Sequence, residues 1–207
     1  VHERAAGRAG RWLPARMAGR LSAMRPASVL SGCAVLFLVA CAPPSFVAEV
    51  QGETTVAAGP PGVSTLLEAF PSIASFGGLD FNQNQDFKNQ GVSKEQVSSA
   101  KLKSIQLKIL SPADQDFSFL DTLEFYAKAG DREVLVAQKR NIASLGLKAP
   151  NPVLEMDLMG EELQPYITAP SMTISVRGKG RMPSKEVRLQ ATVKLDVQVR
   201  LGAVGGS

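Results

Sequence analysis

One segment near the C-terminal end of the chain alternates strictly between apolar and polar residues. Every odd position from Val187 to Leu201 is apolar, and every residue between them is polar or charged. A helix would spread these apolar side chains around its whole circumference, whereas a β-strand directs them all to one face. The pattern therefore predicts a long strand with one buried and one solvated face, which is typical of antiparallel sheets.

Shorter segments with the same alternation precede this strand. They lie at 105–109, 123–127, 134–136, 153–158 and 172–176. Gly130-Asp131 predicts a hairpin turn between the second and third segments. Leu102 is out of phase with the 105–109 strand, which predicts a β-bulge near Ser104. Gly178-Lys179-Gly180 predicts a turn that would join 172–176 to the long strand as a hairpin, with its loop near 177–186.

No stretch of the chain keeps a helical period for more than about ten residues, although 160–167 is compatible with one helical turn. About seven short strands with regular turn signals are typical of a β-sandwich. We therefore predict an all-β fold, an antiparallel β-sandwich spanning residues 71–202. A disordered tail is expected at 203–207.

The first forty residues differ from the rest of the chain. They contain six arginines and a single acid, Glu3, and they end in fourteen uncharged residues, 27–40. A basic stretch followed by a short apolar one is the layout of a secretory signal peptide. Fourteen residues are too few to span a bilayer as a helix, which needs roughly 20. We expect 1–40 to be a signal peptide with a helical apolar part, and the true start to be Met17 or Met24.

The apolar stretch ends in Leu38-Val39-Ala40-Cys41. This motif resembles the lipobox of bacterial lipoproteins. The resemblance implies cleavage after Ala40 and a covalent diacylglyceryl group on Cys41, and the absence of an Asp at position 42 implies retention in the outer membrane. Cys33 ends a similar motif but follows too short an apolar run to be the lipidated residue.

The segment after Cys41 is rich in proline and glycine. Pro43-Pro44 and the run Gly59-Pro60-Pro61-Gly62 interrupt regular structure. We predict a lipidated cysteine and flexible tether over 41–70, with a short edge strand at 46–50 as the alternative.

Loss of the signal peptide would change the charge of the protein. The whole chain has a formal net charge of +4, and residues 1–40 alone have a net charge of +5, from six arginines and Glu3. The remaining body is near neutral at −1, so no nucleic-acid partner is expected.

The body also has no histidine and no free cysteine, which excludes Ser-His-Asp and Cys-His catalysis and the usual zinc sites. Ser98 and Lys101 match S-x-x-K, but the motifs that accompany it in serine hydrolases are missing.

Two groups of side chains are candidates for binding. Four residues at every second position carry side-chain oxygens: Asp80, Asn82, Asn84 and Asp86. They resemble the start of a calcium-binding loop, but the residues at the later positions of such a loop do not match its pattern. Four basic residues in one expected loop form a candidate contact for anionic headgroups or polysaccharide: Arg177, Lys179, Arg181 and Lys185. A ligand-binding sheet face would draw on the aromatic residues Phe117, Phe119, Phe125, Tyr126 and Tyr166.

The body resembles the small immunoglobulin-like or jelly-roll sandwiches of bacterial surface lipoproteins, with no motif that identifies one family. The expected function is that of a non-enzymatic, lipid-anchored envelope protein whose β-sandwich acts as a structural or protein-interaction module. The alternative is a polysaccharide- or calcium-binding module on the same scaffold. No cofactor is expected apart from the covalent lipid.

Overall fold

The computed structural model describes residues 44–67 and 69–200. The predicted signal peptide (1–40), its cleavage residues Leu38, Val39 and Ala40, the lipid-bearing Cys41 and the tail at 203–207 all lie outside the described residues.

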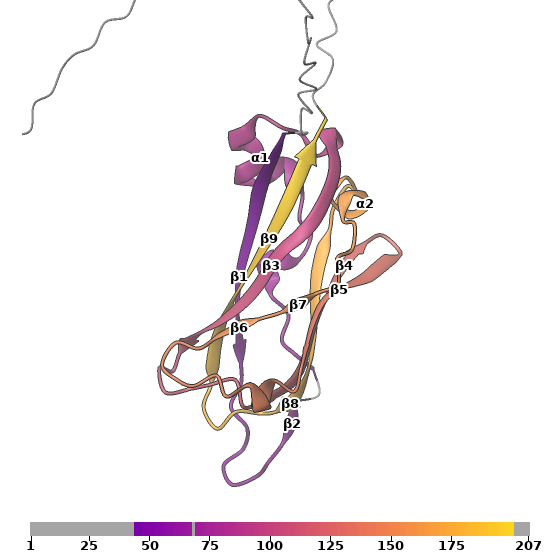
Figure 1. Ribbon diagram of the computed structural model, residues 1–207. Helices are drawn as coiled ribbons and strands as arrows, with labels where there is room; N and C mark the ends of the chain where they lie inside the picture. Colours follow the sequence, from indigo (N-terminus) through magenta and orange to yellow (C-terminus); the bar gives the residue numbers. More distant parts are fainter. Residues whose placement is uncertain (1–43, 68, 201–207) are drawn as a thin grey trace, which may run out of the picture. The chain divides into compact units, whose positions relative to one another are not determined.

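Two antiparallel sheets pack face to face as a β-sandwich (Figure 1), which confirms the predicted fold class. One sheet has the strand order β1-β9-β3-β6, and the other has the order β2-β8-β4-β5-β7. The described residues thus form nine strands, two more than the sequence predicts. Their bounds are β1 Ser45–Val56, β2 Leu66–Leu67, β3 Val97–Ser111, β4 Leu120–Ala129, β5 Arg132–Arg140, β6 Val153–Glu155, β7 Asp157–Leu158, β8 Thr173–Arg181 and β9 Val187–Val199.

Short helices fill the connections between strands. Two of them are α-helical, α1 (Gln85–Gln90) and α2 (Gln164–Ile167), and four are 3₁₀-helices: η1 (Ala74–Phe76), η2 (Phe81–Gln83), η3 (Lys94–Gln96) and η4 (Ile142–Leu145). Each buries at least one side chain, such as Phe76, Phe87 or Ile167. These helices therefore cover parts of the core that the two sheets leave open.

The alternating segment at 187–201 forms β9 up to Val199, as predicted. The burial of each valine or leucine side chain on its inner face contributes roughly 1.5–3 kcal/mol. The apolar side chains of that face are at most 7% exposed; they are Val187, Leu189, Ala191, Val193, Leu195, Val197 and Val199. β9 pairs along its length with β1 on one side and β3 on the other. It is therefore an interior strand of the four-stranded sheet.

Two further predictions are confirmed. The ladder between β3 and β9 shifts register between Leu102 and Ser104, where the out-of-phase Leu102 predicts a bulge. β4 and β5 form a hairpin around Gly130, whose φ of 57° is the left-handed conformation that glycine adopts without a steric penalty.

The prediction of a flexible tether over 41–70 is wrong for its central part. Residues 45–56 form β1, which is far longer than the alternative edge strand at 46–50 and belongs to the sandwich. The buried face of β1 includes Gly52, and a side chain there would overlap Ile73 and Ser75. This close approach requires glycine, which interrupts the apolar alternation and hides the strand in the sequence.

The predicted hairpin between 172–176 and the long strand is also wrong. β8 belongs to the five-stranded sheet and β9 to the four-stranded sheet, so their connection crosses from one layer to the other. Gly178 and Gly180 lie inside β8 rather than in a turn. Gly180 is needed there because a Cβ would overlap the carbonyl oxygen of Phe119 on the neighbouring chain segment.

The single strand predicted over 153–158 is divided between the sheets. β6 pairs with β3, β7 pairs with β5, and Met156 between them is buried. The crossover closes one side of the sandwich. The two ends of the described chain meet at the end of the sandwich where α1 lies (Figure 1). There the amide of Val199 donates to the carbonyl oxygen of Pro44 at 3.0 Å.

Substitution of Gly180 by Ala tests the close approach of β8 to residues 119 and 120. The new methyl group would collide with backbone, which cannot rotate away, so the free energy of unfolding should fall by about 1–3 kcal/mol. Urea denaturation followed by circular dichroism measures this. Gly77→Ala is the matched control, because its Cβ would meet nothing nearer than the Ala74 carbonyl oxygen at 3.5 Å. Equal stability of the two variants would contradict the packing described here.

Candidate functional site

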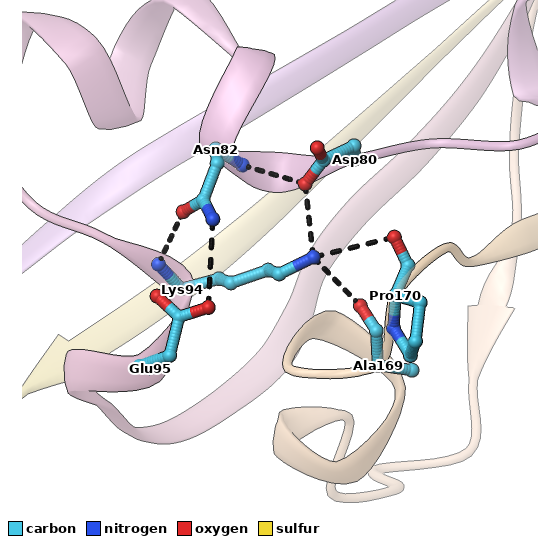
Figure 2. A network of polar contacts seen from close by, with 6 residues as sticks. All are labelled: Asp80, Asn82, Lys94, Glu95, Ala169 and Pro170. Atoms are coloured by element: carbon cyan, nitrogen blue, oxygen red, sulfur yellow. Dashed lines mark hydrogen bonds and ion pairs between the residues drawn. The ribbon is translucent and has the colours of Figure 1, made fainter.

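The most enclosed polar cluster surrounds Lys94, the only charged residue buried among those described (Figure 2). Its ammonium group donates to Asp80 Oδ1 at 3.0 Å and to the carbonyl oxygens of Ala169 at 2.9 Å and Pro170 at 3.3 Å. Three acceptors match the three protons of an ammonium group. The charge is therefore fully hydrogen-bonded, as a buried charge must be to avoid a large desolvation cost.

Asp80 and Asn82 organise the other side of this cluster. Asp80 Oδ1 also accepts from the amide of Asn82 at 3.1 Å and so caps η2. Asn82 Oδ1 in turn accepts from the amide of Lys94 at 2.8 Å. The hydrogen bond from Lys94 and the one from the Asn82 amide hold the pKa of Asp80 below its ordinary value, because both stabilise the carboxylate.

Asn84 and Asp86 serve a different purpose. Asn84 Oδ1 caps α1 by accepting from the amides of Asp86 at 2.9 Å and Phe87 at 3.4 Å. The side-chain amide of Asn84 donates to the Glu49 carbonyl oxygen at 3.2 Å, and Asp86 Oδ2 accepts from the Glu49 amide at 2.7 Å. These two side chains therefore occupy the outer edge of β1.

The four oxygen-bearing residues at 80–86 thus do not converge on one point. Their spacing reflects two consecutive helix caps, because Asp80 caps η2 and Asn84 caps α1. Where a cation would meet Asp80, the structure has the ammonium group of Lys94. Within residues 44–67 and 69–200, no three or more His, Cys, Asp or Glu side chains are grouped so as to hold a metal ion.

The four basic residues at 177–185 do not share a loop. Arg177, Lys179 and Arg181 alternate along β8 and are exposed on its outer face. Lys185 lies in the following loop, where it pairs with Asp114 at 2.6 Å. The prediction of one basic loop is therefore wrong, although three of the four side chains do share one surface.

Arg177 is held in place by two neighbouring strands. Its guanidinium group donates to both carboxylate oxygens of Glu133 at 2.8 Å and lies 4.1 Å from the centre of the Tyr126 ring. The Tyr126 hydroxyl donates to Glu124 Oε2 at 2.8 Å. This bond to Glu124, with the burial of the hydroxyl, raises the pKa of Tyr126, and the bond to Glu133 raises the pKa of Arg177.

A groove of about 510 Å³ lies over this face. Its polar lining comes from three strands: Thr122 and Glu124 of β4, Arg177 and Lys179 of β8, and Arg140 of β5. Thr122 is directly opposite Arg140 in one ladder and Lys179 in the other, so these three side chains form a row across the sheet. Of these five residues, the sequence predicts only Arg177 and Lys179 as candidate contacts for an anion. The sequences of β4 and β5 do not indicate that these strands lie next to β8 in the sheet.

The aromatic residues proposed for a binding face are divided between core and surface. Phe117, Phe119 and Phe125 are buried in the core and cannot contact a ligand. Tyr126 lies on the outer face beneath Arg177, and Tyr166 lies 5.6 Å from the guanidinium group of Arg132. The S-x-x-K match at Ser98 and Lys101 lies in β3 rather than on a helix, so the two side chains lack the shared helical face that this motif needs.

Comparison with known proteins provides few leads. No protein-family model matches the chain, and no curated protein matches it. Among solved structures, it is similar to the BFDV capsid protein in a decameric form (9% identity, TM-score 0.39, 76% of this chain and 99% of that chain). A 60-mer of the same capsid protein gives 11% identity and a TM-score of 0.40 over 79% of this chain and 96% of that chain. Turnip yellow mosaic virus gives 11% identity and a TM-score of 0.30 over 80% and 100%. Similarities at these scores carry no inference about function.

Substitution of Lys94 by Met tests the structural role of the buried ammonium group. The variant keeps the aliphatic packing but removes the hydrogen bonds that Lys94 donates to Asp80 and to two carbonyl oxygens, so the free energy of unfolding should fall by about 1–3 kcal/mol. Thermal and urea denaturation measure the loss. Lys88→Met is the control, since Lys88 is exposed and bonds the Gln83 side chain at the surface. A stable Lys94→Met protein that binds calcium would instead favour a cation site.

The pH dependence of Asp80→Asn provides an independent test. A carboxyl group with a lowered pKa stabilises the folded state above its unfolded pKa, near the ordinary value of 3.8, and that stabilisation is lost as the pH falls through the folded pKa. The variant should therefore be less stable than the wild type at pH 7, and the difference should shrink below about pH 4. Urea midpoints measured between about pH 7 and pH 2.5 give this difference. A difference that is constant with pH would show that the ionised carboxylate does not contribute.

Proposed function

We propose that this chain is a lipid-anchored protein of the bacterial cell envelope, with a non-enzymatic β-sandwich that acts as an interaction module. In this proposal Cys41 carries the lipid, and Leu38, Val39 and Ala40 precede the cleavage site. Ala42 in place of Asp favours the outer membrane. The described residues contain no helix long and apolar enough to cross a membrane.

The observation that carries the proposal is where the folded body begins. The carbonyl of Pro44 is hydrogen-bonded to Val199, and β1 starts at Ser45. Three residue steps separate Cys41 from Pro44, and an extended chain spans at most about 11 Å over that length. A lipid on Cys41 would therefore hold the α1 end of the sandwich close to the bilayer. The loops at the opposite end, such as 57–65, would face away from it.

A non-enzymatic role is supported by the chemistry of the body. Residues 44–67 and 69–200 include no histidine and no cysteine, and the interior between the sheets is filled by apolar side chains. Lys94 is paired with Asp80, and Arg177 is paired with Glu133.

Replacement of Cys41 by Ser tests the anchor. Because the thiol is the acylated group in lipoproteins of this type, the variant should lose covalent lipid completely. Metabolic labelling with an alkyne fatty acid, followed by immunoprecipitation, measures acylation directly. Membrane fractionation then locates the wild-type protein, which should cofractionate with the outer membrane.

Cys33→Ser is the matched control, because Cys33 ends the similar Leu30-Ser31-Gly32-Cys33 motif. It should retain full labelling. Continued labelling of Cys41→Ser, or loss of labelling in Cys33→Ser, would overturn the assignment of Cys41.

A further inference from the structure

The groove over β4, β5 and β8 combines an excess of positive charge with hydroxyl and carboxylate groups. Among the described residues, Arg140, Arg177 and Lys179 line it with a single acid, Glu124. Arg177 is already paired with Glu133, whereas neither Arg140 nor Lys179 forms an ion pair with another residue in the described part of the chain. Two cations are therefore available to a ligand, one on each side of Thr122.

The spacing of these two cations suits one anionic group between them. Arg140 and Lys179 lie two strands apart, so their Cα atoms are separated by about 10 Å. Both side chains are long and exposed, and from opposite sides they can reach a common point above Thr122. The Thr122 hydroxyl lies beneath that point and can donate a further hydrogen bond. Carboxylate and phosphate groups are the anions that guanidinium and ammonium groups bind best.

The remaining lining indicates what should carry the anion. β4 carries Thr122 and Glu124 and is hydrogen-bonded to β8 on one side and β5 on the other, so no peptide strand can be added next to β4. Glu124 lies in the groove, and its Oε2 is bound by Tyr126. A carboxylate accepts hydrogen bonds from sugar hydroxyls but repels the closely spaced acids of an acidic peptide. The polar part of the lining thus matches a chain of hydroxyl-rich rings that bear separated negative charges, and Ala69, Phe70 and Val176 form an apolar part of the same groove.

We propose that this groove binds an acidic glycan, with a carboxylate or phosphate group of the sugar held between Arg140 and Lys179 and ring hydroxyls bonded to Glu124 and Thr122. This deepens the proposed interaction role by assigning a ligand class to one surface. It does not depend on acylation of Cys41, because binding and labelling are measured separately.

The test is a binding titration of the purified full-length protein in detergent, by calorimetry at low ionic strength. The probes are oligogalacturonate, which carries carboxylates, and phosphorylated dextran, which carries phosphates. Unmodified dextran and poly-L-glutamate serve as the neutral and peptide comparisons. At least one of the two acidic glycans should bind, and the one that binds identifies the anion. Binding should weaken as salt is raised, because the charges are exposed.

The double variant Arg140→Gln/Lys179→Gln should weaken that binding at least about tenfold. Lys185→Gln is the matched control, since it removes the same kind of charge from the loop outside the groove and should change affinity less than about twofold. Melting curves of both variants should match the wild type, as all three side chains are exposed.

Four results would overturn the proposal: no binding of either acidic glycan, equally tight binding of unmodified dextran, binding of poly-L-glutamate as tight as that of the glycans, or undiminished binding by the double variant. Should these occur while Cys41 is still labelled, the groove assignment fails and the anchor stands.

Discussion

The fold depends on β9, whose buried face and two hydrogen-bonded edges join distant parts of the chain. It pairs with β1 from the beginning of the body and with β3 from its middle. β1 has no other strand partner among the described residues, so its place in the sandwich depends on this ladder. Ion pairs on the solvated face follow the same pairing, with Lys194 bonded to Glu49 and Arg188 to Glu53. Contacts of such long sequence separation are costly in loop entropy, and the continuous apolar face of β9 offsets that cost.

The segment between β1 and β3 protects the edge that this arrangement leaves open. An unpaired edge strand invites pairing with other chains. Here the backbone of Glu49 is bonded by Asn84 and Asp86, and the Gln51 carbonyl oxygen accepts from the Ser75 hydroxyl. Lys94 then ties the same segment to residues 169 and 170. The polar repeat at 80–86, which resembles a metal site in the sequence, is therefore best explained as the means by which this edge is covered.

The five-stranded sheet has a polar outer face of its own. The outer face of β4, β5 and β8 carries a stacked Arg177 and Tyr126 and the row formed by Arg140, Thr122 and Lys179. In the described part of the chain, the interior offers no comparable site, since phenylalanine and aliphatic side chains fill it. The groove proposed to bind an acidic glycan therefore lies on the outer face of the five-stranded sheet.

The sequence by itself determined the properties that depend on neighbouring residues: the all-β class, the two faces of β9, the bulge beside Leu102 and the turn at Gly130, because side-chain periodicity and backbone conformation are local. Only the tertiary structure decided which strands pair. It placed β8 and β9 in different sheets, made residues 45–56 of the expected tether into β1, and placed Arg140 and Lys179 on either side of Thr122. Gly52 and Gly180 lie inside β1 and β8 at positions where the sequence pattern does not predict a strand, and the reason is the same for both. The need for a glycine at each position arises from a close approach by residues far away in the chain, and no local pattern records such a contact.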